Sequence, residues 1–379
     1  MTPKPIVAAV LSVAATTSFA GEIERRGDPS MILFEEGKNY VEFSAASVSP
    51  SVSGTPLPVA GPVSGTGNIQ GDYRSFAGGY KHDLTDKLSL ALVIDEPVGA
   101  KVDYQGPIAI LGGSFFGTSF ADVESLALTG MARYKATDRI SVYGGLRYIG
   151  LSGDLGVTSP ATLGNPGPGR STNQPYTLSV EKDWQLGYLL GAAYEIPAIA
   201  LRVALTYESK TEHDFKDNTG TPFEVELPQS VTLHAQSGIA ANTLLFGSVR
   251  WREWTKFEVR PTDFIRVTPT PGGPVFDNPA IASGPSDIWT YELGLGRRFN
   301  ENWSGAVILG YEKDEGDIVG NLSGKDGFFS YGLAATYETP EWEITVGIRY
   351  FDIGDTNSNV TNFSDNDAFA FGTKFAFRF

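Results

Sequence analysis

The chain contains no cysteine, and this absence removes several classes of function at once. Without thiols there are no disulfides, no thiolate metal sites and no cysteine nucleophile. Histidine is scarce, with three residues. Only 19% of the 379 residues are charged, and the net charge of −15 disfavours binding to nucleic acid. The fold must therefore be stable without disulfides, and its function must not depend on thiol chemistry.

Long apolar runs are missing as well. After residue 20, no segment has the roughly 18 consecutive apolar residues that a membrane-spanning helix needs. The nearest candidate, residues 104–121, carries no charge but is interrupted by Gly106-Pro107 and Gly112-Gly113. If this chain crosses a membrane, it does so with strands.

The beginning of the chain has the pattern of a secretory signal peptide. Lys4 precedes an apolar stretch over residues 6–15, and Ser18-Phe19-Ala20 provides small residues for cleavage before Gly21. We therefore predict that residues 1–20 are a signal peptide and take no part in the fold.

Glycine and aromatic residues are abundant, and the aromatic residues alternate with small or charged ones. In an extended strand, successive side chains point to opposite faces. The closing segment DAFAFGTKFAFRF places Lys374 and Arg378 on one face and five rings on the other, namely Phe369, Phe371, Phe375, Phe377 and Phe379. Residues 125–135, 140–148 and 343–350 alternate in the same way. This pattern predicts strands with one apolar face.

Tight turns and long loops separate these segments in strict succession. Six tight turns, such as residues 85–87 and 137–139, interleave with seven long loops, such as residues 49–71 and 259–285, and this arrangement requires 14 strands. An even number of strands with short turns at one end and long loops at the other is typical of a bacterial outer-membrane barrel. We predict an all-β fold, a 14-stranded antiparallel transmembrane β-barrel over residues 39–379.

The third strand of this barrel carries an interruption. Residues 88–95 alternate regularly, but Glu96-Pro97-Val98-Gly99 breaks the pattern before residues 100–104 resume it. Proline donates no ladder hydrogen bond, and glycine tolerates the backbone angles of a bulge. Two interpretations remain open: the wall bends or parts here, or the strand ends at Asp95 below a longer loop.

Several segments resemble the outer-membrane hydrophobic-compound transporters typified by the long-chain fatty acid transporter FadL. Asp28-Pro29-Ser30, followed by YVEFSAASVSPSVSG, is similar to the family's plug exit and first strand. The segment LRVALTYESKTEHDFKD at residues 201–217 is the most specific match, and GFFSYGLAATY near the end also fits. Asp-Pro-Ser replaces the family's Asn-Pro-Ala, and the segment before the first strand is shorter than the usual plug.

The resemblance implies a passive channel for hydrophobic molecules, fatty acids among them, in the bacterial outer membrane. It implies an N-terminal hatch over residues 21–38 and an exit through the wall at the third-strand kink. It also implies an apolar outer loop that captures ligand, and basic lumen residues that could meet a ligand carboxylate. The residues assigned to these parts are, for the hatch, Glu24, Arg25, Arg26, Asp28 and Pro29; for the lateral gate, Asp95, Glu96, Pro97 and Gly99; for the capture loop, Ile108, Ile110, Leu111, Phe115, Phe116 and Phe120; and for the carboxylate, Arg147, Lys210, Arg250 and Arg252.

A general porin and an outer-membrane hydrolase are two alternative functions for such a barrel. The short hatch raises the alternative of a general, water-filled porin. An outer-membrane hydrolase would need a pair such as His213 and Asp214, but neighbours on a strand point apart and no Gly-x-Ser-x-Gly elbow is present. We expect no cofactor and no metal, since the acidic loops match no calcium-loop spacing. The expected partners are hydrophobic small molecules, outer-membrane lipid and lipopolysaccharide, with the chain as a monomer.

Overall fold

The computed structural model describes residues 23–56, 65–104, 108–110, 113–115, 119–157, 162–163, 176–268, 271–273, 275–316, 322–323, 325–358 and 361–379. The predicted signal peptide lies outside these residues. No helix in the described ranges is long and apolar enough to cross a membrane.

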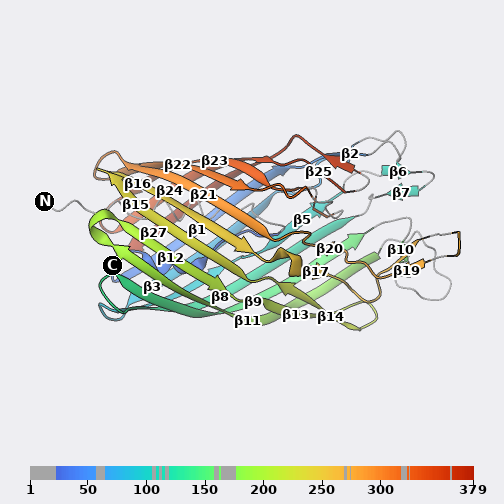
Figure 1. Cartoon of the computed structure of the whole chain (residues 1–379), viewed down its shortest axis with the longest axis horizontal. Coiled ribbons are helices and arrows are strands. Elements are labelled where there is room, and N and C mark those ends of the chain that lie inside the picture. Colours follow the sequence, from blue (N-terminus) through green and yellow to red (C-terminus); the bar gives the residue numbers. More distant parts are fainter. Residues whose placement is uncertain are drawn as a thin grey trace.

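Fifteen strands in the described residues form a single sheet that closes on itself (Figure 1). They are β1 (Asn39–Ser51), β3 (Tyr73–Asp83), β4 (Leu88–Asp95), β5 (Gly99–Asp103), β8 (Phe120–Lys135), β9 (Ile140–Val157), β11 (Tyr176–Ile196), β12 (Leu201–Glu208), β15 (Ser230–Ala240), β16 (Thr243–Arg252), β21 (Ile288–Arg298), β22 (Trp303–Glu312), β23 (Phe328–Glu338), β24 (Trp342–Ile353) and β27 (Asn366–Arg378). Because β4 and β5 both pair with β8, they share one position in the wall. The predicted 14-stranded antiparallel barrel is confirmed.

The first and last strands close the wall. β1 pairs with β27 over its whole length, and the amide of Asn39 donates to the carbonyl of Phe379 at 3.0 Å. Tight turns lie at one end of the barrel and long loops at the other, as Figure 1 shows. The long-loop end carries short strands: β2 (Gly54–Pro56), β6 (Ile108–Ile110), β7 (Gly113–Phe115), β10 (Thr162–Leu163), β13 (Thr211–Lys216), β14 (Pro222–Leu227), β17 (Glu258–Val259), β18 (Ile265–Thr268), β19 (Val275–Asp277), β20 (Ala282–Ser283), β25 (Thr356–Asn357) and β26 (Thr361–Phe363).

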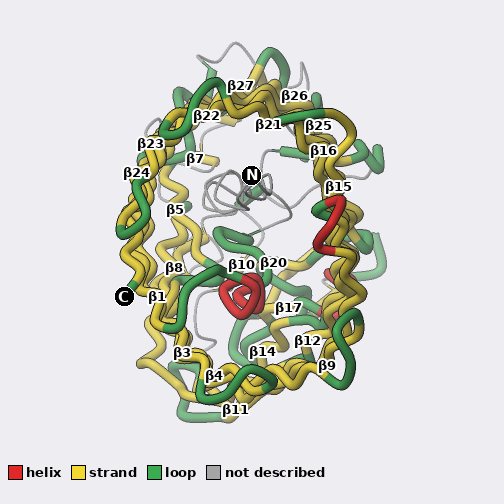
Figure 2. Tube along the Cα trace, turned by 90° about the vertical axis from the view of Figure 1, so that its left-hand side faces the viewer, coloured by secondary structure: helices red, strands yellow, loops and turns green. Residues whose placement is uncertain are grey.

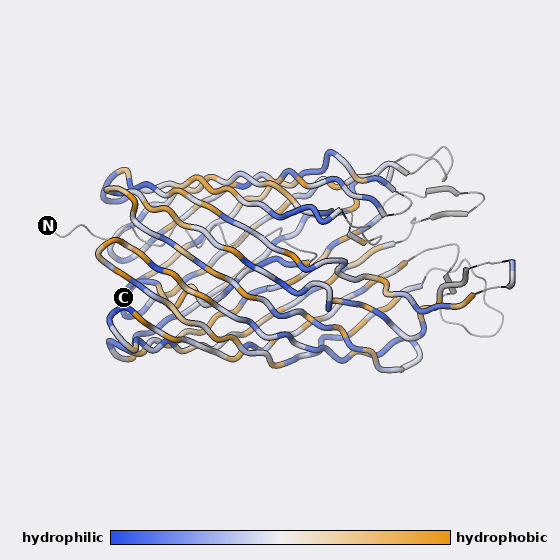
Figure 3. The backbone as a smooth tube through the Cα atoms, in the orientation of Figure 1, coloured by the Kyte–Doolittle hydropathy of each residue, from blue (hydrophilic) through white to orange (hydrophobic). Residues whose placement is uncertain are grey.

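The outer face of the wall is apolar and the inner face is small or polar, as the alternation predicts. Phe371 and Phe375 in β27 are each 46% exposed, whereas Lys374 between them is 1% exposed. The alternation of hydropathy along the strands is visible in Figure 3. An exposed apolar band around a closed barrel is stable in hydrocarbon, since closure leaves no free sheet edge and the strands pair with one another within the wall.

The N-terminal segment lies inside the barrel. Figure 2, which looks along the barrel, shows a short helix within the ring of strands. This is the 3₁₀ helix η1 (Pro29–Phe34), which begins after Asp28 because the Asp28 carboxylate accepts a hydrogen bond from the amide of Ser30 at 2.8 Å. Pro29 occupies its first turn, where a proline is tolerated. Two further 3₁₀ helices, η3 (Pro197–Ile199) and η4 (Trp254–Lys256), lie at a turn and a loop.

Aromatic and charged contacts hold η1 against the inner wall. Phe34 packs edge-on against Tyr143, with ring centroids 5.5 Å apart. The guanidinium groups of Arg133 and Arg202 lie 4.0 and 4.8 Å from the centre of the Phe34 ring. Cation–π contacts of this kind are favourable where water is excluded. The segment is therefore fixed within the lumen rather than trailing from it.

Candidate functional site

The predicted interruption of the third strand is present. β4 ends at Asp95 and β5 begins at Gly99. β4 pairs with both neighbours, β3 and β8, whereas β5 pairs in the sheet with β8 alone among the described strands. Residues 74–77 of β3 therefore pair with no strand on this side of the described wall. We call this place the wall break.

Side chains replace some of the missing ladder bonds at the wall break. The amide of Phe76 in β3 donates to the carboxylate of Glu96 at 3.1 Å. On the other side, the amide of Val98 donates to the hydroxyl oxygen of Ser125 at 3.0 Å. Of the four predicted gate residues, Asp95 ends β4, Glu96 and Pro97 form the interruption, and Gly99 begins β5.

Residues 23–26, which belong to the segment predicted to be the hatch, lie against the wall break from inside the barrel. The amide of Gly99 donates to the carbonyl of Ile23 at 2.8 Å, and the amide of Arg25 donates to the carbonyl of Pro97 at 2.9 Å. Glu24 and Val98 form an isolated antiparallel bridge between these bonds. Residues 23–26 thus bond residues 97–99, which β3 does not reach, whereas residues 101–103 bond the segment 69–71 just before β3.

Two arginine side chains of the hatch fill the gap beside β3. The guanidinium of Arg25 lies 4.4 Å from the centre of the Tyr73 ring, and a Cβ on Gly99 would overlap it. Arg26 donates to the hydroxyl oxygens of Ser75 at 2.9 Å and of Ser44 at 3.0 Å. A residue larger than glycine at position 99 would have to displace Arg25.

A chain of buried ion pairs crosses the lumen from the hatch to the wall. Glu24 contacts Arg250 at 2.8 Å and Arg252 at 2.9 Å. Arg250 also contacts Glu208 at 3.1 Å, and Arg147 contacts both Glu208 and, at 3.1 Å, Asp95. All six side chains are at most 11% exposed. The structure brings together three of the four predicted basic residues, each already paired with a carboxylate.

Lys210 does not join this chain. Its side chain is 50% exposed and pairs with Glu212 at 2.6 Å and Glu226 at 3.0 Å. It borders a groove with Leu186 and Tyr188, which are exposed residues of the outer wall.

A cavity of about 160 Å³ adjoins residues 26–35 of the hatch. Its lining carries charges of both signs from the hatch and the wall, including Arg26, Asp28, Asp95, Arg250, Glu292 and Lys374. Asp28 also lies 3.5 Å from the ring of His234. Apolar side chains, among them Ile32, Phe246 and Phe351, also line the cavity, so this part of the lumen has a mixed character.

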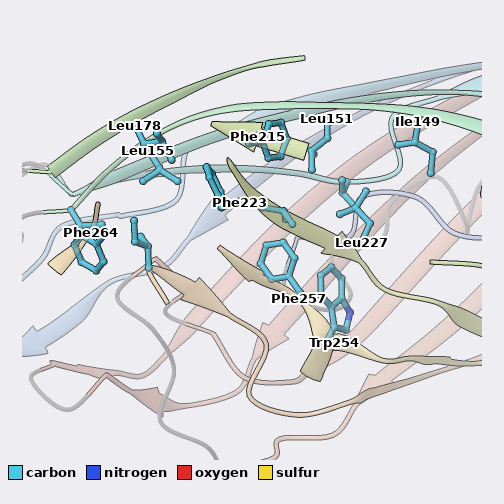
Figure 4. Close-up of a cluster of buried hydrophobic side chains, with 14 of the residues drawn as sticks. Ile149, Leu151, Leu155, Leu178, Phe215, Phe223, Leu227, Trp254, Phe257 and Phe264 are labelled. Carbon is cyan, nitrogen blue, oxygen red and sulfur yellow. The ribbon is translucent and has the colours of Figure 1, made fainter. Parts of the chain in front are cut away.

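An apolar pocket of about 100 Å³ adjoins residues 23–25 of the hatch and Gly99. No local sequence signal predicts it, because its apolar lining comes from β5, β8, β9 and several long loops, with the side chains Val102, Val123, Leu155, Phe257, Ile281 and Leu322. It borders the large buried cluster drawn in Figure 4, to which Leu155 and Phe257 belong. The pocket therefore lies directly beside the wall break.

The predicted capture loop is described only in part. Ile108 and Ile110 belong to β6, which pairs with β7, the strand that contains Phe115. Leu111 and Phe116 lie outside the described residues. The ring of Phe120, the first residue of β8, lies against Gly156. Ligand capture by this loop stays a prediction.

The histidine considered for hydrolysis is buried. His213 in β13 is 0% exposed, whereas the neighbouring Asp214 is exposed, so the two point apart as expected for a strand. The ring of His213 lies 3.2 Å from the hydroxyl of Thr211 and 3.4 Å from the carboxylate of Asp183. In the described part of the chain, no group of three His, Cys, Asp or Glu residues could hold a metal ion.

Comparisons with known proteins agree on the architecture. A family described as outer membrane protein transport protein (OMPP1/FadL/TodX) matches residues 29–304. A FadL homologue from Pseudomonas aeruginosa has a TM-score of 0.73 at 14% identity, covering 97% of this chain and 98% of that one. The Pseudomonas putida toluene transporter TodX has 0.66 at 12%, covering 100% and 99%. The Ralstonia pickettii toluene transporter TbuX has 0.63 at 13%, covering 97% of each chain. At such identities the likeness concerns the fold. No curated protein sequence matched the chain.

Proposed function

Because the chain belongs to the outer membrane protein transport protein family (OMPP1/FadL/TodX), and is therefore an outer-membrane transport protein, we propose that it carries hydrophobic molecules passively into the cell. In this proposal a ligand is captured at the long-loop end, rests in the apolar pocket and leaves sideways through the wall break into the membrane. Long-chain fatty acids are the first class of ligand we expect, and monoaromatic hydrocarbons are the second.

The observation that carries the proposal is the position of the apolar pocket, which lies directly beside the wall break. Residues 23–25 line a pocket that is walled mainly by apolar side chains, and Gly99 at the wall break belongs to the same lining. An alkyl chain that left this pocket for water would lose roughly 0.8 kcal/mol for each exposed methylene. The wall break at Gly99 touches the apolar pocket, so a sideways exit avoids this loss.

The structural relatives support the class of ligand without fixing its identity. Two of the solved structures are described as toluene transporters and a third as a FadL homologue. The buried cations Arg250 and Arg252 favour a ligand with a carboxylate over a neutral hydrocarbon, since each of them already contacts the Glu24 carboxylate. Fatty acids therefore come first in our proposal.

The porin alternative predicts a different electrical behaviour. A porin needs a continuous wet path, but residues 23–26 are bonded to the wall break and η1 is packed against β3, β4 and β8 inside the lumen. We expect no steady ionic current when the protein is inserted into planar bilayers. A steady current through the wild-type barrel would favour the porin.

Uptake by cells that lack their own transporter tests the exit. We expect the double variant P97A/G99A to take up labelled hexadecanoate several-fold more slowly, because an alanine at position 97 can donate a ladder bond and the methyl group at position 99 stays in the gap after Arg25 has left it. The matched control is P50A/G130A, with a proline in β1 and a glycine whose added Cβ meets no atom within 4 Å. Unchanged uptake in P97A/G99A would remove the side exit and leave the barrel intact.

A further inference from the structure

Glu24 lies in an unusual position for a hatch residue, because its carboxylate is enclosed by two arginines of the far wall. Its side chain is 3% exposed, and those of Arg250 and Arg252 are 10% and 11% exposed. Among the described residues, Glu24 provides the ion pair of Arg252, whereas Arg250 also contacts Glu208. The row of buried ion pairs carries no net charge as long as Glu24 is in place, because three carboxylates then face three guanidinium groups.

The backbone of the same residue closes the wall break. Glu24 bridges Val98, and the neighbouring carbonyl of Ile23 and amide of Arg25 bond Gly99 and Pro97. The next side chain, Arg25, fills the gap between Tyr73 and Gly99. A displacement of the Glu24 carboxylate would therefore pull on the segment that blocks the exit.

Glu24 also lines the apolar pocket, together with Ile23 and Arg25. A molecule with an apolar tail in this pocket and a carboxylate at one end would bring its charge close to Glu24. A neutral hydrocarbon could not replace Glu24, because Arg250 would keep only Glu208, and Arg252 would lose its one ion pair among the described residues.

We propose that Glu24 occupies the binding site for the head group of an anionic amphiphile, and that the ligand carboxylate takes its place on Arg250 and Arg252. The exchange keeps the buried charges balanced while it frees residues 23–26, and Arg25 then leaves the wall break. Glu24 is thus a built-in counter-ion that makes opening depend on a charged ligand. This inference rests on the proposed function and names the chemistry that releases the hatch.

The absence of cysteine makes the exchange measurable in the full-length protein. Val98 is 0% exposed beneath Glu24, so a V98C variant reports whether the hatch is lifted. We expect hexadecanoate to accelerate modification of V98C by a methanethiosulfonate reagent, and hexadecanol to leave it unchanged. In V98C/E24Q the modification is expected to be about tenfold faster or more without ligand, since losing one partner of a buried ion pair weakens the contact strongly. Hexadecanoate should then add little.

Two controls separate this effect from general loosening of the barrel. A368C carries an equally buried cysteine in β27, away from the hatch, and its modification should not respond to either ligand. V98C/E212Q loses a carboxylate that pairs with exposed Lys210, and it should behave like V98C.

Three results would overturn the inference. Equal acceleration by hexadecanol and hexadecanoate would show that the head group plays no part. Calorimetric binding of hexadecanoate without faster modification of V98C would show that the hatch stays in place, while the proposed uptake would still stand. Failure of the protein to bind or take up either compound would remove the proposed function and, with it, the exchange.

Discussion

Replacement of Glu35 by glutamine should abolish a pH dependence of hatch docking. Glu35 caps the end of η1, and its side chain is buried near Glu343, Glu42, Lys374 and Arg378. Burial raises the pKa of the Glu35 carboxyl from 4.5 to about 7; Lys374 acts against this rise, and Glu343 adds to it. The carboxylate is therefore disfavoured while the hatch is docked.

The sign and size of the effect follow from this shift. A released hatch exposes Glu35 to water, where it loses its proton near pH 4.5, whereas the docked hatch keeps the proton up to about pH 7. Docking is therefore most favourable at low pH and weakens as the pH rises through this window. At about 1.36 kcal/mol per pKa unit, the loss is roughly 3 kcal/mol, with no further change above pH 7.

Hydrogen–deuterium exchange of the η1 amides at several pH values, corrected for the intrinsic rate, measures this free energy. In the wild type we expect the opening free energy to fall by about 3 kcal/mol between pH 4.5 and 7, and in E35Q to stay level. The backbone carbonyl of Glu35, which accepts from the Lys81 ammonium at 2.9 Å, is unaffected by the substitution. Parallel pH profiles of the two proteins would refute the assignment to Glu35.

Three further predictions concern stability, each measured by denaturant unfolding in lipid vesicles. F371R places a charge on the lipid face near the middle of β27 and should cost about 2–4 kcal/mol; a neutral effect would mean that this face does not meet hydrocarbon. W254A removes a fully buried ring that packs edge-on against Phe257 (Figure 4) and should cost about 3–5 kcal/mol, unless the cluster collapses into the space. E343Q leaves buried Lys374 without the carboxylate at 3.0 Å and should cost about 3–5 kcal/mol; a loss below about 1 kcal/mol would show that another acid takes over.

The barrel and its interruption could be predicted from the sequence because both depend on local chemistry. Side chains alternate between the faces of a strand wherever that strand lies, so the ring of Phe371 and the charge of Lys374 reveal the two faces of the wall without any knowledge of neighbours. Proline and glycine likewise act on their own backbone, and Pro97 and Gly99 mark the break for that reason.

The tertiary structure alone decided what closes the break and what lies beside it. Glu24 meets Arg252 across the lumen although 228 positions separate them, and no local pattern encodes such a meeting. The apolar pocket is built from strands and loops that come together only when the barrel closes. The exposed position of Lys210 could not be predicted from the sequence. Lys210 follows the end of β12, where the regular alternation that separates lumen-facing from outward-facing residues has stopped. The periodicity of a strand is fixed by its own backbone, whereas contacts across a lumen are fixed by closure of the whole sheet.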